Sequence, residues 1–301
     1  MAAESAQFPG AATVSLLEPS LLARLERLQI LTRRRLAGNL ASEHRSPEHG
    51  ESLDFAEYRD YYPGDDFRRI DYQALARLDQ IFVRLFEAED DLTVRLLVDT
   101  SASMTPSKLR QAVRVAAALG FVGLVRRDVV TLHTFPLSRP ARRFTGRHAS
   151  HALFEQLEAI DAAGPQGETP FVGAARDLLS RPGPRGLTVV VSDLLTPEWE
   201  DGLTRLPSRG GDLVMVHVLA ADELRPDLIG DLDLVDRETG ARVPVSLSPD
   251  ALRRYEQLAL AWADGIARRC HQLGAGYVRV LDDDDVEKVL LARWRAAGVL
   301  R

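Results

Sequence analysis

Short apolar runs alternate with amphipathic stretches along most of the chain. The apolar runs have the length of strands and are found at residues 93–99, 129–135, 187–193, 212–219 and 276–281. The stretches between and after them have helical spacing and cover residues 107–126, 151–160, 171–179, 249–273 and 285–297, with a further short helix between 193 and 212. Nearly continuous apolar strands alternating with helices are typical of a parallel sheet that is covered on both faces. The pattern predicts an α/β fold with a doubly wound, mostly parallel sheet.

Two segments predict antiparallel hairpins beside this sheet. The strand-like run at 81–89 is joined to residues 93–99 by an acidic turn, which favours a hairpin at the edge of the sheet. The segment DLDLVDRETGARVPVSL has turn residues around Glu238, Thr239 and Gly240, which predict a small hairpin insert.

The N-terminal part has a different pattern and predicts a separate extension. From Pro19 the spacing of Leu21, Leu25 and Leu28, continued by Leu36 and Leu40, is helical, with Ser20 as the expected capping residue. Residues 41–54 are rich in Ser, His, Pro and Gly and predict a loop. We therefore expect an N-terminal helical and loop extension at 1–80, which includes the segment YYPGDDFRRIDY, and an α/β domain at 81–301.

Composition and charge exclude several kinds of protein. The 301 residues are 45% hydrophobic and carry a formal net charge of −6, whereas binding to a phosphate backbone needs a basic surface. Nucleic acid is therefore not the expected partner. The single cysteine, Cys270, lies in a helical pattern and cannot build a disulfide or a thiolate zinc site.

The sequence also predicts no membrane segment. Its first residues lack the basic start and apolar core of a signal peptide. The apolar stretch 115–125 is too short to span a bilayer. We expect a cytoplasmic protein.

Oxygen-bearing side chains follow the predicted strands at the edge where parallel sheets bind ligands. Asp99, Ser101 and Ser103 follow the first parallel strand, Asp193 ends a later one, and Thr169 lies in a loop that leads into a helix on the same side. Two carboxylates and three hydroxyls suit a hard divalent ion, Mg²⁺ first, with Mn²⁺ or Ca²⁺ as alternatives. Few charged ligands leave such an ion electrophilic, so that an Asp or Glu of a partner protein can complete its coordination.

Three other interpretations of this motif remain open. The Asp and Ser residues could be a turn that caps a helix. A serine nucleophile would need a histidine base, but His133 and His217 interrupt buried strands and are expected to be core residues. A metal-dependent hydrolase would need a general base beside the ion, for which Glu168 is the candidate. The sequence contains neither of the glycine-rich nucleotide motifs and no GxSxG motif, and we do not expect an enzyme.

The same motifs resemble those of von Willebrand factor A-type domains. DTSASM at 99–104 resembles their DxSxS motif, GETPFVGAARDLL their threonine loop, and VVVSD their second aspartate strand. The resemblance implies a metal-ion-dependent adhesion site, with Ser101, Ser103 and Thr169 near the ion and Asp99 and Asp193 at or just behind it. Leu194 stands where such domains often have glycine.

Residues 49–89 resemble the hallmark of the bacterial family called domain of unknown function 58. The matching residues are Tyr61, Gly64, Asp65, Asp66, Arg68, Ile70, Asp71, Ala76 and Arg77, with Tyr72 where tryptophan is usual. Members of this family often occur beside MoxR-type AAA+ ATPases, which implies a role as an adaptor or chaperone partner. The expected function is therefore a protein-interaction module with a Mg²⁺-dependent rim. A metal-free scaffold and, less favoured, a metal-dependent hydrolase are the alternatives.

Overall fold

The computed structural model describes residues 16–32, 55–62, 70–78, 80–86, 92–136, 141–181, 183–184, 186–209 and 211–300. The chain divides into two compact units, and each is described by itself. The smaller unit is Ala37–Asp91, and the larger combines Met1–Leu36 with Leu92–Arg301.

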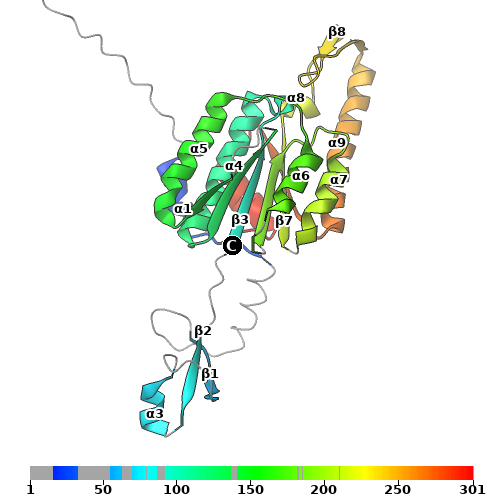
Figure 1. The fold of residues 1–301 in the computed structure, drawn as a ribbon. Helices are drawn as coiled ribbons and strands as arrows, with labels where there is room; N and C mark the ends of the chain where they lie inside the picture. Colours follow the sequence, from blue (N-terminus) through cyan, green and yellow to red (C-terminus); the bar gives the residue numbers. More distant parts are fainter. Residues whose placement is uncertain are drawn as a thin grey trace, which may run out of the picture. The chain divides into compact units, whose positions relative to one another are not determined.

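The larger unit is built on a six-stranded sheet with the strand order β10-β7-β6-β3-β4-β5 (Figure 1). In chain order its strands are β3 (Thr93–Asp99), β4 (Val129–Phe135), β5 (Arg142–Thr145), β6 (Gly186–Ser192), β7 (Asp212–Leu219) and β10 (Gly276–Leu281). All neighbours are parallel except β4 and β5, which form an antiparallel pair at one edge. The predicted fold class, an α/β fold with a mostly parallel sheet, is confirmed.

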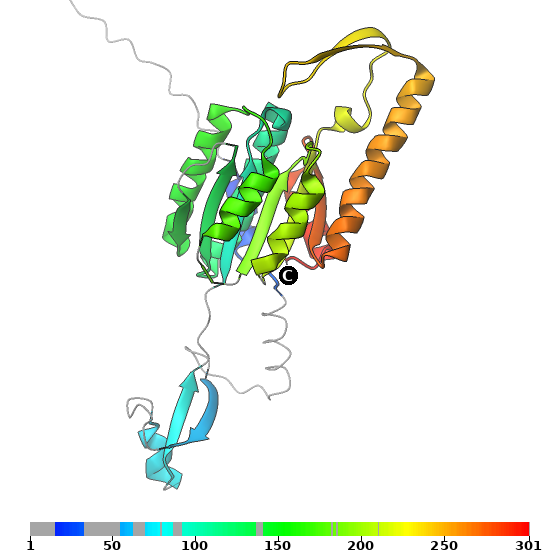
Figure 2. The same ribbon diagram turned by 45° about the vertical axis from the view of Figure 1, so that its right-hand side comes forward.

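Helices cover both faces of this sheet (Figures 1 and 2). They are α1 (Pro19–Leu25), α4 (Pro106–Val125) and α5 (Ser150–Ala163) on one face, and α6 (Phe171–Ser180), α7 (Trp199–Arg205) and α9 (Pro249–Gln272) on the other. Alternating side chains of β3 serve the two layers, because Leu96 and Val98 pack with α4 while Leu97 packs with α6. Burial on both faces explains why the strands are continuous apolar runs.

Short elements complete the larger unit. They are η2 (Ala102–Met104), η3 (Arg147–Ala149), η4 (Leu206–Arg209), α8 (Ala221–Leu224), α10 (Val286–Lys288), the π-helical η5 (Val289–Arg293) and α11 (Trp294–Ala296). The last three form one helical segment where the sequence predicted a helix at 285–297. Its Trp294 is buried in the same core as α1 and α4. In the ranges that the structure describes, no helix has both the length and the hydropathy needed to cross a membrane.

The N-terminal helix α1 belongs to the larger unit. Leu21 and Leu25 are buried in its core, and Ile30 forms an isolated bridge with Leu300. The helix is shorter than its predicted pattern, and its capping position is Glu18, so the expected cap at Ser20 is wrong. Leu36 and Leu40 lie outside the described residues.

In the described residues of the smaller unit there are an antiparallel pair of strands and one helix. The strand β1 (Phe55–Asp60) pairs with β2 (Phe82–Phe86), and α3 (Tyr72–Leu78) lies between them in the chain. Asp71 precedes α3, and its Oδ1 accepts a hydrogen bond of 3.1 Å from the Ala74 N–H. The motif residues Gly64, Asp65, Asp66 and Arg68 lie outside the described part of the chain.

The predicted hairpin between residues 81–89 and 93–99 is wrong. The strand β2 pairs with β1 instead, and both edges of β3 are taken by the parallel strands β4 and β6. All seven residues of β3 are buried, as an interior position in the sheet requires. The division of the chain consequently differs from the expected 1–80 and 81–301, because β2 belongs to the smaller unit and α1 to the larger.

The predicted insert between α8 and α9 is a hairpin, as expected. It consists of β8 (Gly230–Val235) and β9 (Arg242–Leu247), which pair in antiparallel register (Figures 1 and 2). No residue from 230 to 247 is buried, and apolar side chains such as Leu234 and Val243 are exposed. The hairpin therefore contributes little to the core of the unit.

Candidate functional site

The two predicted aspartates lie side by side at the carboxyl end of adjacent strands. Asp99 ends β3 and Asp193 directly follows β6, and these strands pair in register with Val98 opposite Val191. Both aspartate side chains are fully buried, with 0% of their surface exposed. The sheet topology thus places two carboxylates from distant parts of the sequence at one rim.

Asp99 is held by hydrogen bonds to both of its carboxylate oxygens. Its Oδ1 accepts from the Ser101 N–H at 2.9 Å, and its Oδ2 accepts from the Ser192 hydroxyl at 2.6 Å. Burial, and next the negative charge of Asp193, raise the pKa of Asp99 to about 7. A cation at the rim would relieve this repulsion and favour the ionised pair.

The two serine hydroxyls connect this pair in a compact oxygen cluster. Ser101 Oγ lies 3.0 Å from Ser103 Oγ, which donates to Asp193 Oδ1 at 3.3 Å. Ligand oxygens at 2.0–2.1 Å around an octahedral Mg²⁺ are about 2.9 Å from their neighbours. Hydroxyl and carboxylate oxygens at these separations fit a small, hard ion. Across the described residues no three His, Cys, Asp or Glu side chains gather to hold a metal, so the hydroxyls are essential to such a site.

The loop that carries Thr169 is fastened to the first loop by backbone hydrogen bonds. The Gln166 N–H donates to the Thr100 carbonyl and the Ala102 N–H to the Gly167 carbonyl, both at 2.8 Å. Thr169 is buried, and its own hydrogen bonds go to a residue of the insert hairpin. Its hydroxyl donates to Glu238 Oε1 at 2.6 Å and its N–H to Glu238 Oε2 at 3.1 Å.

The structure therefore joins four of the five predicted ligands directly by hydrogen bonds and brings the fifth to the same rim. Asp99, Ser101, Ser103 and Asp193 form the connected cluster. Thr169 is linked to it through its loop, while its hydroxyl faces the carboxylate of Glu238.

A buried lysine, which sequence reasoning missed, occupies one side of the cluster. The Lys108 ammonium donates to Asp193 Oδ2 at 2.7 Å and also to Glu223 Oε1. Its side chain is 0% exposed. Burial disfavours the ammonium, but the charges of Asp193 and Glu223 outweigh it, so the pKa of Lys108 is raised. The chain thus places its own cation on Oδ2 of Asp193.

His217 positions the backbone of Asp193. Its Nε2 lies 3.0 Å from the Asp193 carbonyl oxygen, and its Nδ1 lies 2.9 Å from the Tyr277 hydroxyl. Burial lowers the pKa of His217 to about 3, so the ring is neutral at pH 7. The hydrogen bonds assign Nε2 as donor and Nδ1 as acceptor. His217 is the satisfied core histidine that the sequence predicted, and it holds Asp193 in place.

Leu194, the residue in the place of the usual glycine, adopts a left-handed backbone conformation. Its φ is 54°, in the region that favours glycine. Its N–H donates to Ser192 Oγ at 2.9 Å, and its side chain is fully buried. The loop thus keeps the conformation that a glycine would adopt, and leucine stabilises it through packing.

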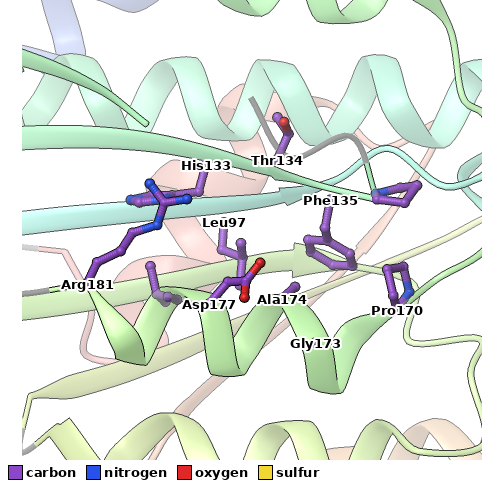
Figure 3. Close-up of a pocket in the computed structure, with 11 residues that line it drawn as sticks. Leu97, His133, Thr134, Phe135, Pro170, Gly173, Ala174, Asp177 and Arg181 are labelled. Carbon is purple, nitrogen blue, oxygen red and sulfur yellow. The ribbon is translucent and has the colours of Figure 1, made fainter. Parts of the chain in front are cut away.

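The other histidine of the buried strands, His133, lies at a separate pocket. His133, on β4, lines a small pocket of about 170 Å³ between the sheet and α6, together with Asp177 and Arg181 (Figure 3). None of the five predicted ligands, here called the rim residues (Asp99, Ser101, Ser103, Thr169 and Asp193), lines this pocket. The His133 Nε2 lies 3.2 Å from Thr131 Oγ1. Glu168, the candidate general base, is exposed.

Comparison with protein families identifies one match. The model described as protein of unknown function DUF58 matches residues 57–262. This range includes the segment at 57–89 and all five rim residues.

Related proteins come from mycobacteria. The chain is 30% identical over 279 residues to an uncharacterized protein, Rv1480, of Mycobacterium tuberculosis, a match that covers 89% of this chain and 87% of the relative. A shorter uncharacterized protein of Mycobacterium avium is 29% identical over 165 residues, covering 54% of this chain and 95% of the relative.

Two solved structures from Bacteroides are distantly similar. One is the conserved hypothetical protein BatB of Bacteroides thetaiotaomicron, with 14% identity, 69% of this chain and 98% of the other covered, and a TM-score of 0.39. The other is an aerotolerance-related membrane protein of Bacteroides fragilis, with 17% identity, the same coverage and a TM-score of 0.41.

Proposed function

The chain belongs to the DUF58 family, and from this premise we propose that it binds a partner protein through a divalent metal ion, Mg²⁺ first, at the carboxyl rim of its sheet. In this proposal it is a binding protein of the cytoplasm and not an enzyme. The observation that carries the proposal is the cluster of Asp99, Ser101, Ser103 and Asp193, whose oxygens have the separations of neighbouring ligands around a small ion.

Each rim residue has a defined part in this proposal. Ser101 and Ser103 would hold the ion with their hydroxyls, and Asp193 would contribute Oδ1 while Lys108 keeps its Oδ2. Asp99 would act just behind, because both of its oxygens already accept hydrogen bonds. When bound, the ion offers a coordination position to a carboxylate. Thr169, the fifth predicted ligand, donates its hydroxyl and N–H to the Glu238 carboxylate and would hold a partner's carboxylate in the same way beside the ion.

The nature of the partner follows from the same chemistry. A rim with hydroxyl and N–H donors and a metal ion that accepts an oxygen ligand would recognise an Asp or Glu side chain on another protein. The resemblance of residues 49–89 to a family found beside MoxR-type AAA+ ATPases supports such an ATPase as the partner. We propose that the chain acts with it as an adaptor.

The buried lysine gives a specific reason for one alternative, a metal-free scaffold. The ammonium of Lys108 already neutralises part of the charge of Asp193 and Glu223. In that alternative the rim binds its partner through the loops alone, and no ion is needed.

Mg²⁺ is expected to raise the melting temperature of the wild-type protein, and Asp99→Ala to abolish the rise. An ion at about 100 times its dissociation constant contributes about 2.7 kcal/mol, which corresponds to roughly 5–10 °C for a domain of this size. Asp99→Ala removes the carboxylate behind the ion. The measurement is thermal unfolding with Mg²⁺, with Mn²⁺ and with EDTA.

Two further variants make this result specific. Asp99→Asn keeps the shape of the side chain and is also expected to lose the rise. Asp283→Asn is the matched control, because Asp283 is an exposed aspartate after β10 at the same end of the sheet. Equal rises in the wild type and both Asp99 variants would favour the metal-free scaffold.

Partner capture is expected to depend on the same ion. In affinity purification from the source cells, EDTA or Ser101→Ala should reduce the amount of the retained partner, because each removes part of the metal site. The amount of partner retained with and without Mg²⁺ is the quantity to compare. Capture that is indifferent to both treatments would contradict a metal-dependent rim.

A further inference from the structure

The turn of the insert hairpin has a fixed shape that presents one side chain. Oδ1 of Asp236 accepts from the N–H groups of Glu238 and Thr239, both at 2.8 Å. The Gly240 N–H donates to the Asp236 carbonyl at 2.9 Å, and the Asp236 N–H to the Ala241 carbonyl at 2.8 Å. These bonds hold the backbone at Glu238, the residue of the turn whose side chain is not fully exposed to solvent.

This side chain contacts Thr169, one of the five predicted ligands. Both oxygens of the Glu238 carboxylate accept from Thr169, one from the hydroxyl at 2.6 Å and one from the N–H at 3.1 Å. Hydrogen bonds to an ionised acceptor are stronger than neutral ones. The chain thus places its own carboxylate against the donors that would recognise the carboxylate of a partner.

Arg237, the neighbour of Glu238, shows that the turn also borders the loop that follows β3. Arg237 lines a groove of about 630 Å³ together with Thr105 of the β3–α4 connection, Ser107 at the start of α4 and Glu223 of α8. Glu238 contacts the Thr169 loop. The tip of the hairpin is therefore placed across the loops that carry the predicted ligands, as its position above the strand ends in Figure 2 shows.

We propose that Glu238 is a tethered ligand of the rim, which closes the site until the carboxylate of a partner displaces it. The inference rests on the proposed function for the identity of the competitor, but the closure itself rests on the contacts of Glu238 and Thr169 alone. It names the partner chemistry more closely: a Glu or Asp on a tight turn, which competes with the turn at 236–241.

The packing of the hairpin makes displacement physically reasonable. No residue of β8 or β9 is buried, and a two-stranded hairpin has little stability of its own. The hairpin is therefore fixed on the rim mainly by the bonds of its tip. Release costs only these bonds and exposes no core of the larger unit.

Amide hydrogen exchange of the full chain tests the closure. Glu238→Ala is expected to speed exchange roughly tenfold or more at Thr169 and along residues 230–247, since it removes both hydrogen bonds that Thr169 donates to the charged acceptor. Glu238→Gln, which keeps an oxygen acceptor without the charge, should fall between. Asp227→Asn is the matched control, because Asp227 is an exposed acidic residue just before β8 and outside the turn, and it should exchange like the wild type.

A titration with Mg²⁺ alone tests the role as a ligand. If Glu238 closes the rim beside the ion, Glu238→Gln should weaken Mg²⁺ binding, by calorimetry, several-fold relative to the wild type and to Asp227→Asn, which removes the same charge. Unchanged exchange in Glu238→Ala would overturn the inference. So would a measurable Mg²⁺ affinity of the wild type that is equal in Glu238→Gln.

The two proposals fail in different ways. If no variant and no wild-type protein binds Mg²⁺, the metal-dependent function is wrong, while faster exchange at Thr169 in Glu238→Ala still supports a rim closed by Glu238. If Mg²⁺ binds the wild type and exchange does not respond to Glu238→Ala, the metal site stands and the tethered ligand does not.

Discussion

Replacing Lys108 with methionine is expected to lower the free energy of unfolding by about 3–5 kcal/mol in metal-free buffer. Methionine fills similar space but removes the ammonium between Asp193 and Glu223. The fully buried carboxylate of Asp193 is then left beside Asp99 with no positive partner on its Oδ2. An unpaired buried charge costs far more than a surface ion pair gains.

Denaturant unfolding of Lys108→Met and Arg110→Met in EDTA measures this cost. Arg110 is the matched control, because it lies on the same helix and pairs with Asp161 at 3.1 Å while 51% of its side chain is exposed. An exposed pair of this kind contributes at most about 1 kcal/mol. Equal small losses in the two variants would show that the buried charges do not depend on Lys108.

Lys108→Met also tests whether a Mg²⁺ ion and the Lys108 ammonium neutralise the same carboxylate. If both cations neutralise Asp193, Mg²⁺ should stabilise Lys108→Met more than the wild type, because the ion then replaces the missing ammonium. A gain from Mg²⁺ that is identical in the two proteins would show that the ion and the lysine act independently.

Leu194→Ala is expected to destabilise the protein by about 2–5 kcal/mol, and Leu194→Gly is expected to be the more stable of the two. Both substitutions remove a fully buried leucine side chain. Alanine leaves the left-handed strain at φ 54° in place, whereas glycine adopts this conformation without a steric penalty. At a position with negative φ, glycine would instead be the less stable by about 0.4–1 kcal/mol.

Unfolding curves of the two variants under the same conditions give the comparison. The control is a buried position with an ordinary helical backbone. Ala175 in α6 lies in the same core, and Ala175→Gly gives the usual loss of stability from alanine to glycine. Gly202 in α7 is not suitable because it is too closely packed to accept alanine. If Leu194→Gly is less stable than Leu194→Ala by the usual amount, the backbone at this position is not strained. The departure from glycine would then have no energetic consequence.

The elements of the fold could be predicted because each is encoded locally. Strands buried on both faces are continuous apolar runs, and the amphipathic helices between them have their own period, so β4, β7 and β10 begin and end where the sequence predicted. The edge strand β5 was not predicted, since only Phe144 of its four residues is buried and the apolar signal is weak.

The pairing of strands could not be read from such local patterns. The run at 81–89 has the composition of a strand, and proximity in the chain favoured a hairpin with residues 93–99. The structure pairs it instead with β1, more than twenty residues earlier, because both edges of β3 are occupied. Which edge of a strand is free depends on the whole sheet.

The sequence could predict those residues of the candidate site that stand at the ends of strands. Asp99 and Asp193 could be found because each ends an apolar run that a parallel sheet brings to one edge. Lys108 lies 85 residues from Asp193 and Glu238 lies 69 from Thr169, and no periodicity relates such positions. The one available signal was a lysine among the apolar positions at the start of the helix 107–126.

The insert hairpin begins and ends at neighbouring points, and this affects how its length and sequence can differ between members of the family. Gly230 is opposite Leu247, so the chain leaves α8 and returns to α9 through neighbouring points. A segment with adjacent ends can be lengthened, shortened or exchanged without rethreading the sheet. The hairpin is thus a segment that can vary in length and sequence while the sheet beneath it stays the same. If Glu238 closes the rim as proposed, new residues at its turn would alter that closure.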